Sequence, residues 1–494
     1  MLLFQLLILL SIILVITCLK PIDDTSKCVT CQSTVSEWQN NWSNQTTIDA
    51  TIDALKEECK EKYKIKDILK RKLCDEVVNV LVQIPPSLLD GMNSLAWPIP
   101  QALCATIRQC ELFCCDDNNL PEQIHLSAET DKTKMTVTWT TLNANSSYVK
   151  WGTSSDLLNN IEIGTIDTYT ASGWRGSIHS AVMIGLKDKT TYYYQVGNGD
   201  DNKWSDIFTF STFDYSNSIN YAIIGDMAYD QYSDNTVKSL INLVNNNKIQ
   251  AVIHSGDISY ADGYDPHFDD FLNKIQPIAS KVPYMASPGN HEFWDIFAAY
   301  KHRFRMPLFK LTQNMYYNWI NGPAHFISLN SETAIDTADF HELEIEYLKK
   351  VLSNVDRSVT PFVIVHFHRP MYCSNDDECL TKATKLKNKI EDILFENNVD
   401  LVICGHVHVY ERTLNVYNNT INSAGPVYIV QGGSGNREGN KGPYPTDLPE
   451  WSANQQIVVG YGILTISNEY MDFSFFDSNN QDVALDYVRI NKRN

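Results

Sequence analysis

Hydrophobic and polar residues follow different patterns in three successive stretches of the chain. Residues 27–117 carry Lys- and Glu-rich segments with apolar residues at helical spacing, clearest from Ala54 to Val80. In residues 121–213, apolar and polar positions alternate in short runs between polar turn residues, which is typical of β-strands. From residue 219 to about 490, short apolar runs alternate with helical patterns such as Leu343 to Leu352. The patterns predict a helical domain, then a β-sandwich, then an α/β layered domain.

An almost unbroken apolar run opens the chain, from Met1 to about Leu19. We interpret residues 1–19 as a cleaved signal peptide, because a cysteine-rich segment follows at once. The run is long and lacks a basic region before it, so an uncleaved membrane anchor is the alternative.

Cysteines and glycosylation motifs indicate a secretory route. Twelve cysteines occur, and eight of them lie between Cys28 and Cys115, a density that favours disulfides formed in an oxidising compartment. Four N-glycosylation motifs point the same way, at Asn41, Asn44, Asn145 and Asn418. We therefore expect a glycoprotein that is secreted or held in the lumen of a lysosome or vesicle.

Composition restricts the partners of the protein. Hydrophobic residues make up 43% of the chain and charged residues 20%, as in globular proteins, while the formal net charge is -19. Nucleic acid is excluded as a main partner, since phosphate backbones attract Lys and Arg. The same negative charge repels anionic substrates at long range, so affinity for a phosphate ester requires a local source of positive charge. Metal ions are one such source.

Five short apolar runs in residues 219–490 are each followed at once by residues that can bind a metal ion. Two runs lead to an aspartate, one to an asparagine, and two to a His-x-His pair. In chain order these candidate ligands are Asp226, Asp257, Asn290, His366 with His368, and His406 with His408. A single block of this kind is also explained as a turn or a helix cap, but five blocks in this order have no comparable structural explanation.

Open α/β sheets bind ligands beyond the carboxyl ends of their strands, so the five blocks are expected to direct oxygen and nitrogen donors to one place. Glycines stand just before four of the ligands, where they let the chain turn tightly and approach an ion. This mix of donors suits iron, zinc and manganese and does not suit copper(I). The donors are too many for one ion, so the sequence predicts a bridged pair of ions, roughly 3.5–4 Å apart as in other two-metal sites.

Motifs at these blocks resemble those of the calcineurin-like metallophosphoesterases. The matching motifs are Gly225-Asp226, Gly256-Asp257, Gly289-Asn290-His291-Glu292 and Gly405-His406-Val407-His408. Tyr260, which follows Asp257 closely, narrows the resemblance to the purple acid phosphatases, where a phenolate ligand favours Fe³⁺ and gives the enzymes their colour. The resemblance implies a fibronectin-like N-terminal domain at 121–213 and a metallophosphoesterase catalytic domain at 219–490. It also implies an acid phosphatase acting on small phosphate monoesters, with a metal-bound hydroxide as nucleophile.

The family pattern implies two metal sites that share one aspartate. The Fe³⁺ ligands would be Asp226, Asp257, Tyr260 and His408. The ligands of a second, divalent ion (zinc, manganese or Fe²⁺) would be Asp257, Asn290, His368 and His406. His368 is preferred because it directly precedes Arg369-Pro370, as in the family, but His366 would lie on the same face of a strand and is the alternative. His291 would hydrogen-bond the phosphate or the leaving-group oxygen.

One loop departs from the plant members of the family. They carry a His pair nine and ten residues after the divalent-site His, whereas this chain has Asp377 and Glu378 there. The loop resembles the animal long-form enzymes, and we expect a disulfide between Cys373 and Cys379. The acid that protonates the leaving group therefore stays open.

The cysteines of residues 27–117 resemble those of the saposin B family of helical domains. By that resemblance Cys28 would pair with Cys110, Cys31 with Cys104, and Cys59 with Cys74. A zinc site is disfavoured, since the segment contains no His. A cluster of basic residues between Lys56 and Lys72 suggests binding to anionic lipid, although interleaved acidic residues fit a solvated helix face equally well.

The leading function is therefore a phosphomonoesterase, with two alternatives. Acid sphingomyelinases also join a saposin-like domain to a metallophosphoesterase, so a lipid phosphodiesterase is one alternative, which the presence of Tyr260 disfavours. A lipid-binding protein with a silent catalytic fold is the other, and the complete set of candidate ligands disfavours it.

Overall fold

A computed structural model describes residues 112–115, 119–170, 173–332, 339–375 and 377–493. The expected signal peptide and nearly all of the expected saposin B-like domain, with its disulfides and the motifs at Asn41 and Asn44, lie outside these residues. Two compact units are present. In the first, β1 (Leu112–Phe113) pairs in parallel with β7 (Trp174–Arg175). The β-sandwich and the α/β layers both belong to the second unit.

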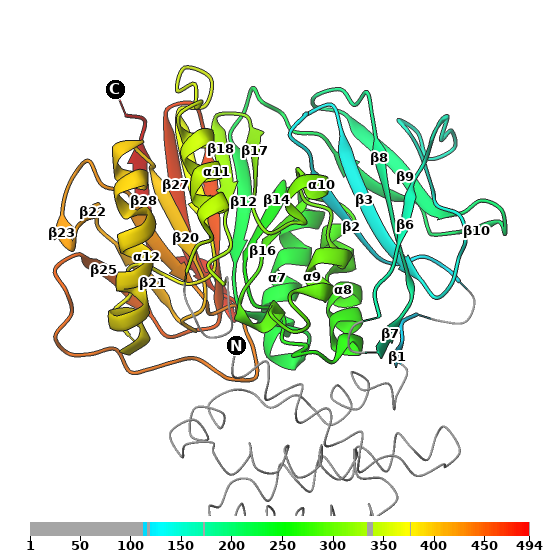
Figure 1. The fold of residues 1–494 in the computed structure, drawn as a ribbon. Coiled ribbons are helices and arrows are strands. Elements are labelled where there is room, and N and C mark those ends of the chain that lie inside the picture. The colour runs from blue at the N-terminus through cyan, green and yellow to red at the C-terminus, as the bar shows by residue number, and fades with distance from the viewer. Residues whose placement is uncertain (1–111, 116–118, 171–172, 333–338, 376, 494) are drawn as a thin grey trace, which may run out of the picture. The chain divides into compact units, whose positions relative to one another are not determined.

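Two antiparallel sheets form the β-sandwich (Figure 1). The order in one sheet is β2 (Glu122–Ala128), β3 (Met135–Thr141), β8 (Ser177–Met183) and β6 (Thr165–Asp167). The other sheet runs β10 (Lys203–Trp204), β9 (Thr191–Asn198), β4 (Tyr148–Gly152) and β5 (Asn160–Ile163), with β11 (Phe208–Ser211) also beside β9. Trp139, Trp151 and Tyr194 lie in one core with residues of both sheets. A β-rich domain followed by an α/β domain is confirmed.

Two further sheets carry the α/β part. The first has the order β16 (Tyr284–Ser287), β14 (Ala251–Ser255), β12 (Ile219–Ile224), β26 (Gly460–Ile466), β27 (Tyr470–Asp477) and β28 (Asn480–Asn491). The second has the order β17 (Tyr317–Asn321), β18 (Ala324–Ser328), β19 (Phe362–His366), β20 (Leu401–Cys404), β24 (Val427–Gln431), β21 (Tyr410–Thr413) and β25 (Ser452–Gln456). Each sheet contains one run of parallel strands, namely β12, β14 and β16 in the first and β18, β19, β20 and β24 in the second.

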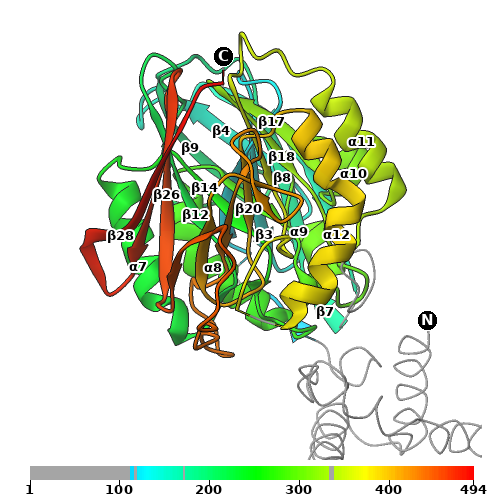
Figure 2. The same cartoon turned by 90° about the vertical axis from the view of Figure 1, so that its left-hand side faces the viewer.

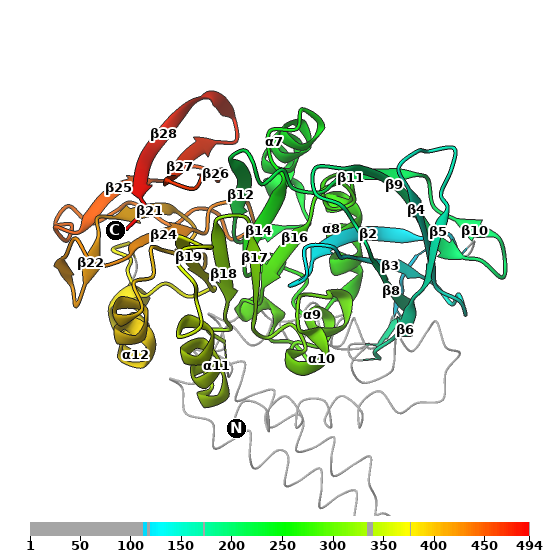
Figure 3. The same ribbon diagram turned by 90° about the horizontal axis from the view of Figure 1, so that it is seen from above.

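Alternate residues of β18, β19 and β20 in the second sheet enter two different hydrophobic cores. In β19, Ile364 belongs to the core between the two sheets, while Val363 and Val365 belong to the core beneath the helices α11 (Glu342–Leu352) and α12 (Asp377–Glu396). Those two helices lie side by side on the outer face of the second sheet (Figure 2 and Figure 3). A strand covered on both faces has apolar residues at every position, which explains the continuous apolar runs in the sequence.

The remaining α-helices all lie between β12 and β17 in chain order. They are α7 (Asp234–Asn245), α8 (Asp265–Ala279), α9 (Ala298–Arg303) and α10 (Phe309–Thr312). Val237 and Leu240 of α7 and Phe271 of α8 pack into the core that also holds β12 and β14. Within the described ranges, none of the helices combines the length and apolar character that a membrane crossing requires.

Buried polar contacts join the sandwich to the α/β layers. Arg303 forms an ion pair with Asp269, with Nη1 2.5 Å from Oδ1, and the same Oδ1 accepts a hydrogen bond from Nε2 of Gln123 at 2.9 Å. The hydroxyl of Tyr194 donates to the carbonyl oxygen of Ser280 at 2.7 Å. Buried charged groups are tolerated only when they are paired and hydrogen-bonded, so these contacts fix the sandwich against the layers that carry the candidate ligands.

The buried histidine of β8 predicts an acid-dependent loss of stability. His179 stacks on Trp139, and burial lowers the pKa of His179 to about 4. Between pH 7 and pH 4 the unfolded chain therefore binds a proton that the folded chain excludes, and the free energy of unfolding falls as the pH falls. From pH 7 to pH 4, the free energy of unfolding of the wild type should fall by roughly 3 kcal/mol more than that of His179→Gln, as measured by urea unfolding. Parallel pH curves for the two proteins would contradict the prediction.

Candidate metal centre

The candidate ligands stand just beyond the carboxyl ends of neighbouring parallel strands. Asp226 follows β12, Asp257 follows β14, and Asn290 follows β16, while His368 follows β19 and His406 follows β20. The first set of strands are neighbours in one sheet, and β19 and β20 are neighbours in the other. Because parallel strands end at one edge, each sheet brings its ligands together, and the two edges meet.

One group of donors contains Asp226, Asp257 and His408, whose nearest ligand atoms lie within 4.8 Å of one another. Nε2 of His408 is 3.4 Å from Oδ1 of Asp226. The hydroxyl of Tyr260 lies 3.0 Å from that nitrogen and 3.4 Å from that oxygen. Nδ1 of His408 contacts the carbonyl oxygen of Gly439 at 3.0 Å, which holds the ring so that Nε2 faces the group.

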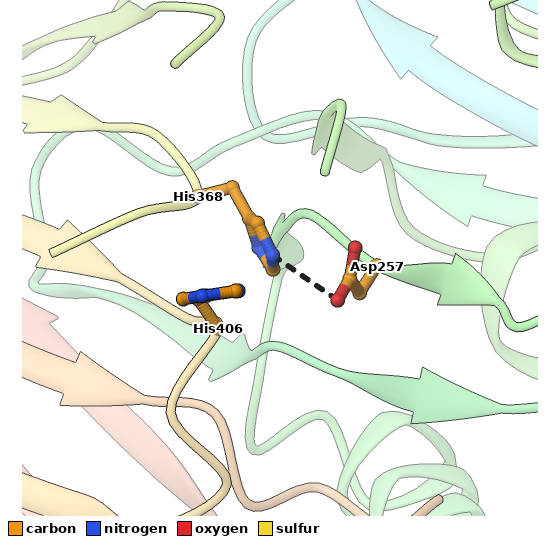
Figure 4. Close-up of side chains that lie close together, drawn as sticks. All are labelled: Asp257, His368 and His406. Atoms are coloured by element: carbon orange, nitrogen blue, oxygen red, sulfur yellow. Dashed lines mark ion pairs between the residues drawn. The ribbon is translucent and has the colours of Figure 1, made fainter. Parts of the chain in front are cut away.

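A second group contains Asp257, His368 and His406, again with ligand atoms within 4.8 Å of one another. Figure 4 shows the three side chains converging, with an ion pair between His368 and Asp257. Nε2 of His368 is 3.1 Å from Oδ2 of Asp257 and 3.1 Å from Oδ1 of Asn290. Nδ1 of His368 contacts the carbonyl oxygen of Ser255 at 3.0 Å, so the ring is oriented from behind.

Asp257 belongs to both groups, and the electrostatics of this buried carboxylate favour cations. Burial opposes its ionisation, but the neighbouring His368 and His291 outweigh burial and hold the pKa of Asp257 well below its usual range. Burial in turn opposes protonation of His368, yet Asp257 and Asp226 raise its pKa to about 9. A proton on His368 thus balances part of the negative charge of Asp257 and Asp226. Bound metal cations would balance this charge instead of the proton, so the donor set fits a pair of cations.

The backbone at the site is held in an unusual conformation. The φ angle is positive at Asp226 (58°), Asp257 (51°), Tyr260 (56°) and His406 (69°). Residues other than glycine rarely adopt this region, and such strain persists where surrounding contacts over-determine it, which is typical of functional sites. The backbone of Gly289 lies so close to the carboxylate of Asp257 that a Cβ on Gly289 would collide with it, which is a second constraint.

His366 is separate from both groups. The side chain is fully buried, and neither ring nitrogen has a hydrogen-bond partner among the described residues. Burial lowers the pKa of His366 to about 3, and its ring faces Tyr317 at 6.2 Å. As the last residue of β19, His366 keeps the strand's alternation and points into the core, whereas His368 lies beyond the strand and turns toward Asp257.

His291 lies beside the first group of donors. Its ring centroid is 4.2 Å from that of Tyr260, and its backbone N–H donates to Oδ1 of Asp257 at 3.0 Å. Nε2 of His291 is 3.8 Å from Oδ2 of Asp257 and 3.4 Å from Oε1 of Glu438. The side chain therefore reaches the candidate centre without belonging to either group of ligands.

Sequence reasoning missed four acidic or basic residues at this edge: Glu292, Glu332, Arg369 and Glu438. Glu292 accepts hydrogen bonds from the backbone N–H groups of Ile258 and Gly289, both at 2.8 Å, so it ties two ligand-bearing loops together. The position of Glu292 inside the Gly-Asn-His-Glu motif is the sequence signal that could have identified it as a site residue. Glu332 and Glu438 carry no comparable signal, because their contacts depend on distant segments of the chain.

The loop that departs from the plant enzymes is described in part. The side chains of Asp377, Glu378 and Cys379 lie outside the described residues, so the Cys373–Cys379 pairing stays a prediction, although Cys373 is disulfide-bonded. Cys114 and Cys115 form a disulfide with each other that the sequence analysis does not predict.

Comparison with protein families covers most of the described chain. Residues 121–212 match the purple acid phosphatase N-terminal domain, and residues 219–410 match the calcineurin-like phosphoesterases. Residues 425–487 match the family described as iron/zinc purple acid phosphatase-like protein C.

Individual relatives match 70% or more of the chain. Probable purple acid phosphatase 20 of Arabidopsis thaliana is 33% identical over 383 residues, 75% of this chain and 87% of the relative. Acid phosphatase type 7 of Danio rerio is 31% identical over 397 residues, 70% of this chain and 86% of the relative. A purple acid phosphatase from yellow lupin seeds has a similar fold, with a TM-score of 0.67 at 23% identity over 76% of this chain and 74% of that one.

The different positions of His366 and His368 predict different effects of their removal. His368→Ala should lose the ion bound by the second group of donors, because the variant lacks a nitrogen that lies 3.1 Å from both Asp257 and Asn290. His366→Ala should keep both ions and lose about 2–4 kcal/mol of stability through the cavity it leaves. Metal analysis and thermal unfolding of both purified variants check this. Retained metal in His368→Ala, or lost metal in His366→Ala, would contradict it.

Proposed function

We propose a role for each site residue from one premise: the chain belongs to the purple acid phosphatase family. It is a metal-dependent acid phosphatase that hydrolyses phosphate monoesters at a binuclear metal centre. The relatives do not favour a lipid phosphodiesterase or a lipid-binding protein with a silent catalytic site. The observation that carries the assignment of roles is the position of Asp257, whose carboxylate is shared by the two groups of donors.

The first ion is Fe³⁺, held by Asp226, Asp257, Tyr260 and His408. The second is a divalent ion (zinc, manganese or Fe²⁺), held by Asp257, Asn290, His368 and His406. The short distances among these donor atoms support both sets. When bound, the cations supply Lewis acidity toward the phosphoryl oxygens and make a nucleophilic water available at acidic pH.

Tyr260 is proposed as the ligand that selects trivalent iron. The side chain is fully buried, and burial together with Asp226 and Asp257 raises the pKa of its hydroxyl well above the ordinary value. The phenol therefore ionises only when a strong positive charge offsets both burial and the two carboxylates. Fe³⁺ provides more charge than a divalent ion, and a phenolate is a hard donor that suits it.

His291 is proposed to act on the substrate. The backbone N–H of His291 donates to Oδ1 of Asp257, and Nε2 of His291 lies close to the first group of donors. A side chain in this position can donate a hydrogen bond to a phosphoryl or leaving-group oxygen.

A secretory destination stays a proposal that rests chiefly on the sequence. Asn145 and Asn418 are exposed and lie outside helices and strands, where a glycan can be attached. Asn418 stands in the turn between β22 (Val416–Tyr417) and β23 (Thr420–Ile421). The disulfide of Cys373 also fits an oxidising compartment. Lipid binding by residues 27–117 stays a prediction from sequence.

Metal content and substrate choice test the function together. The purified protein should contain two metal ions per chain and hydrolyse a chromogenic phosphomonoester at acidic pH. Asp257→Asn should lose both ions and at least about 1,000-fold in kcat/KM, because the carboxylate that both groups of donors share is removed. Dialysis of the wild type against a chelator should abolish activity, and added iron with zinc should restore it. Cleavage of sphingomyelin in preference to the monoester would reject the proposal.

Visible absorption tests the assignment of Tyr260. The wild type should absorb visible light through the phenolate on iron, and Tyr260→Phe should lose this band while keeping bound metal. Tyr317→Phe is the matched control, since Tyr317 is also fully buried but its hydroxyl donates to the carbonyl oxygen of Ala286 at 3.0 Å. The control should keep the band and lose only about 1 kcal/mol of stability. An unchanged spectrum in Tyr260→Phe would exclude Tyr260 as the chromophore.

A further inference from the structure

A glycine-rich segment, residues 432–439, follows β24 and contacts the first group of donors from outside. The carbonyl oxygen of Gly439 lies 3.0 Å from Nδ1 of His408, so the end of the segment orients one donor. Nearer its start, the backbone N–H of Ser434 donates to the carbonyl oxygen of Gly225 at 3.2 Å. Gly225 is the residue just before the first donor aspartate, so the segment contacts the surroundings of two donors.

Gly435 allows the segment to pack closely against the loop that carries Asp226. Its φ angle is 109°, which residues with a side chain rarely adopt, and a Cβ on Gly435 would collide with the carbonyl oxygen of Tyr232. The carbonyl oxygen of Gly435 accepts a hydrogen bond from the backbone N–H of Ala228 at 2.9 Å. Ala228 stands two residues after Asp226, so the segment is bonded to the chain on both sides of this donor.

The side chain of Asn436 contacts Asp226 itself. Nδ2 of Asn436 donates to the backbone carbonyl oxygen of Asp226 at 3.1 Å, and Oδ1 accepts from the backbone N–H of Glu438 at 3.0 Å. The side chain is buried, with 4% of its surface exposed. Turning the amide over would set oxygen against oxygen and N–H against N–H, so the two partners together fix its orientation.

The hydrogen bond from Asn436 acts on a strained residue. The φ angle of Asp226 is 58°, and a residue other than glycine keeps such a conformation only where surrounding contacts hold it. The backbone N–H of Asp226 donates to the carbonyl oxygen of Gly256 at 3.1 Å, while its carbonyl oxygen is held by Asn436. Because the peptide groups on both sides of Asp226 are fixed, its carboxylate is directed toward His408, with Oδ1 3.4 Å from Nε2.

We propose that Asn436 is a positioning residue of the metal centre, which holds the backbone of Asp226 so that the Asp226 carboxylate stays at the proposed Fe³⁺ site. This inference rests on the proposed function of the centre. Asp226 belongs to the first group of donors and not to the second, so the effect of Asn436 falls on one of the two ions. Contacts that orient a metal ligand from behind typically change metal affinity by about 10- to 100-fold.

The test compares Asn436→Ala with Asn314→Ala in the full-length, metal-loaded protein. Asn314 is the matched control, because it is fully buried and its amide also bridges backbone groups. Its Nδ2 donates to the carbonyl oxygen of Phe304 at 2.9 Å, and its Oδ1 accepts from the backbone N–H of Met306 at 2.9 Å. Neither partner is a candidate ligand. An Fe³⁺ chelator is titrated into each protein, and three quantities are measured: the visible band expected from the Tyr260 phenolate, the content of both ions, and the unfolding temperature.

Asn436→Ala should lose half of the visible band at a chelator concentration about 10- to 100-fold lower than the wild type requires, while the second ion stays bound. Asn314→Ala should unfold at a lower temperature but lose the band at the wild-type chelator concentration. If Asn436→Ala does not fold, Asn436→Ser takes its place, because Ser keeps a polar group there and is one bond too short to reach the Asp226 carbonyl.

A wild-type chelator requirement in the folded Asn436 variant would overturn the proposal. Equal shifts in the Asn436 and Asn314 variants would also overturn it, since the effect would then be a general loss of stability. Loss of both ions together would do the same, because the effect would not be confined to the ion that Asp226 binds. If the wild type itself held no pair of ions, the proposed function would fail instead.

Discussion

The negative charge of Asp226 and Asp257 is the constraint on which the site depends. Both carboxylates are buried, and Asp257 lies between two sets of histidine nitrogens. Burial raises the pKa of Asp226, although His368 and His408 counteract it, and the same carboxylates raise the pKa of His368 to about 9. Carboxylates that attract protons onto their histidines would instead attract metal cations when these are available. The fold therefore concentrates buried negative charge that two bound cations would neutralise.

Strand ends, loop conformation and close packing all serve that arrangement. Two sheets bring the carboxyl ends of their parallel strands together, and strained φ angles at Asp226 and Asp257 turn the side chains inward. Gly289 lets one ligand loop approach the carboxylate of Asp257, and Glu292 binds the backbone of that loop to the loop of Asp257. The precision of the centre thus comes from backbone contacts between segments that are far apart in sequence.

Local patterns were sufficient to predict the strands and most of the candidate ligands, because an apolar run followed by Gly-Asp is visible in a few consecutive residues. Strand periodicity alone could not separate His366 from His368, since a two-residue spacing puts both on one face of an ideal strand, and the preference for His368 came from the family resemblance. The distinction arises because β19 ends at His366, and the chain beyond it leaves the strand geometry. The pairing of Arg369 with Glu332 was invisible for another reason: it joins the segments that follow β18 and β19, and only the sheet topology makes them neighbours.

The charges around the centre are unevenly distributed, and this bears on how an acidic protein handles an anionic substrate. Beside His406 lies the guanidinium of Arg369, whereas beside His291 and His408 lies the carboxylate of Glu438, 3.4 and 4.0 Å from their Nε2 atoms. The Arg369 guanidinium is itself paired with Glu332, so neither Arg369 nor Glu438 gives a phosphate ester net electrostatic attraction. Long-range attraction is not available to a chain of net charge -19, so recognition depends on contacts made after the substrate has arrived. Short, oriented hydrogen bonds from fixed donors are the interactions that remain effective under that condition.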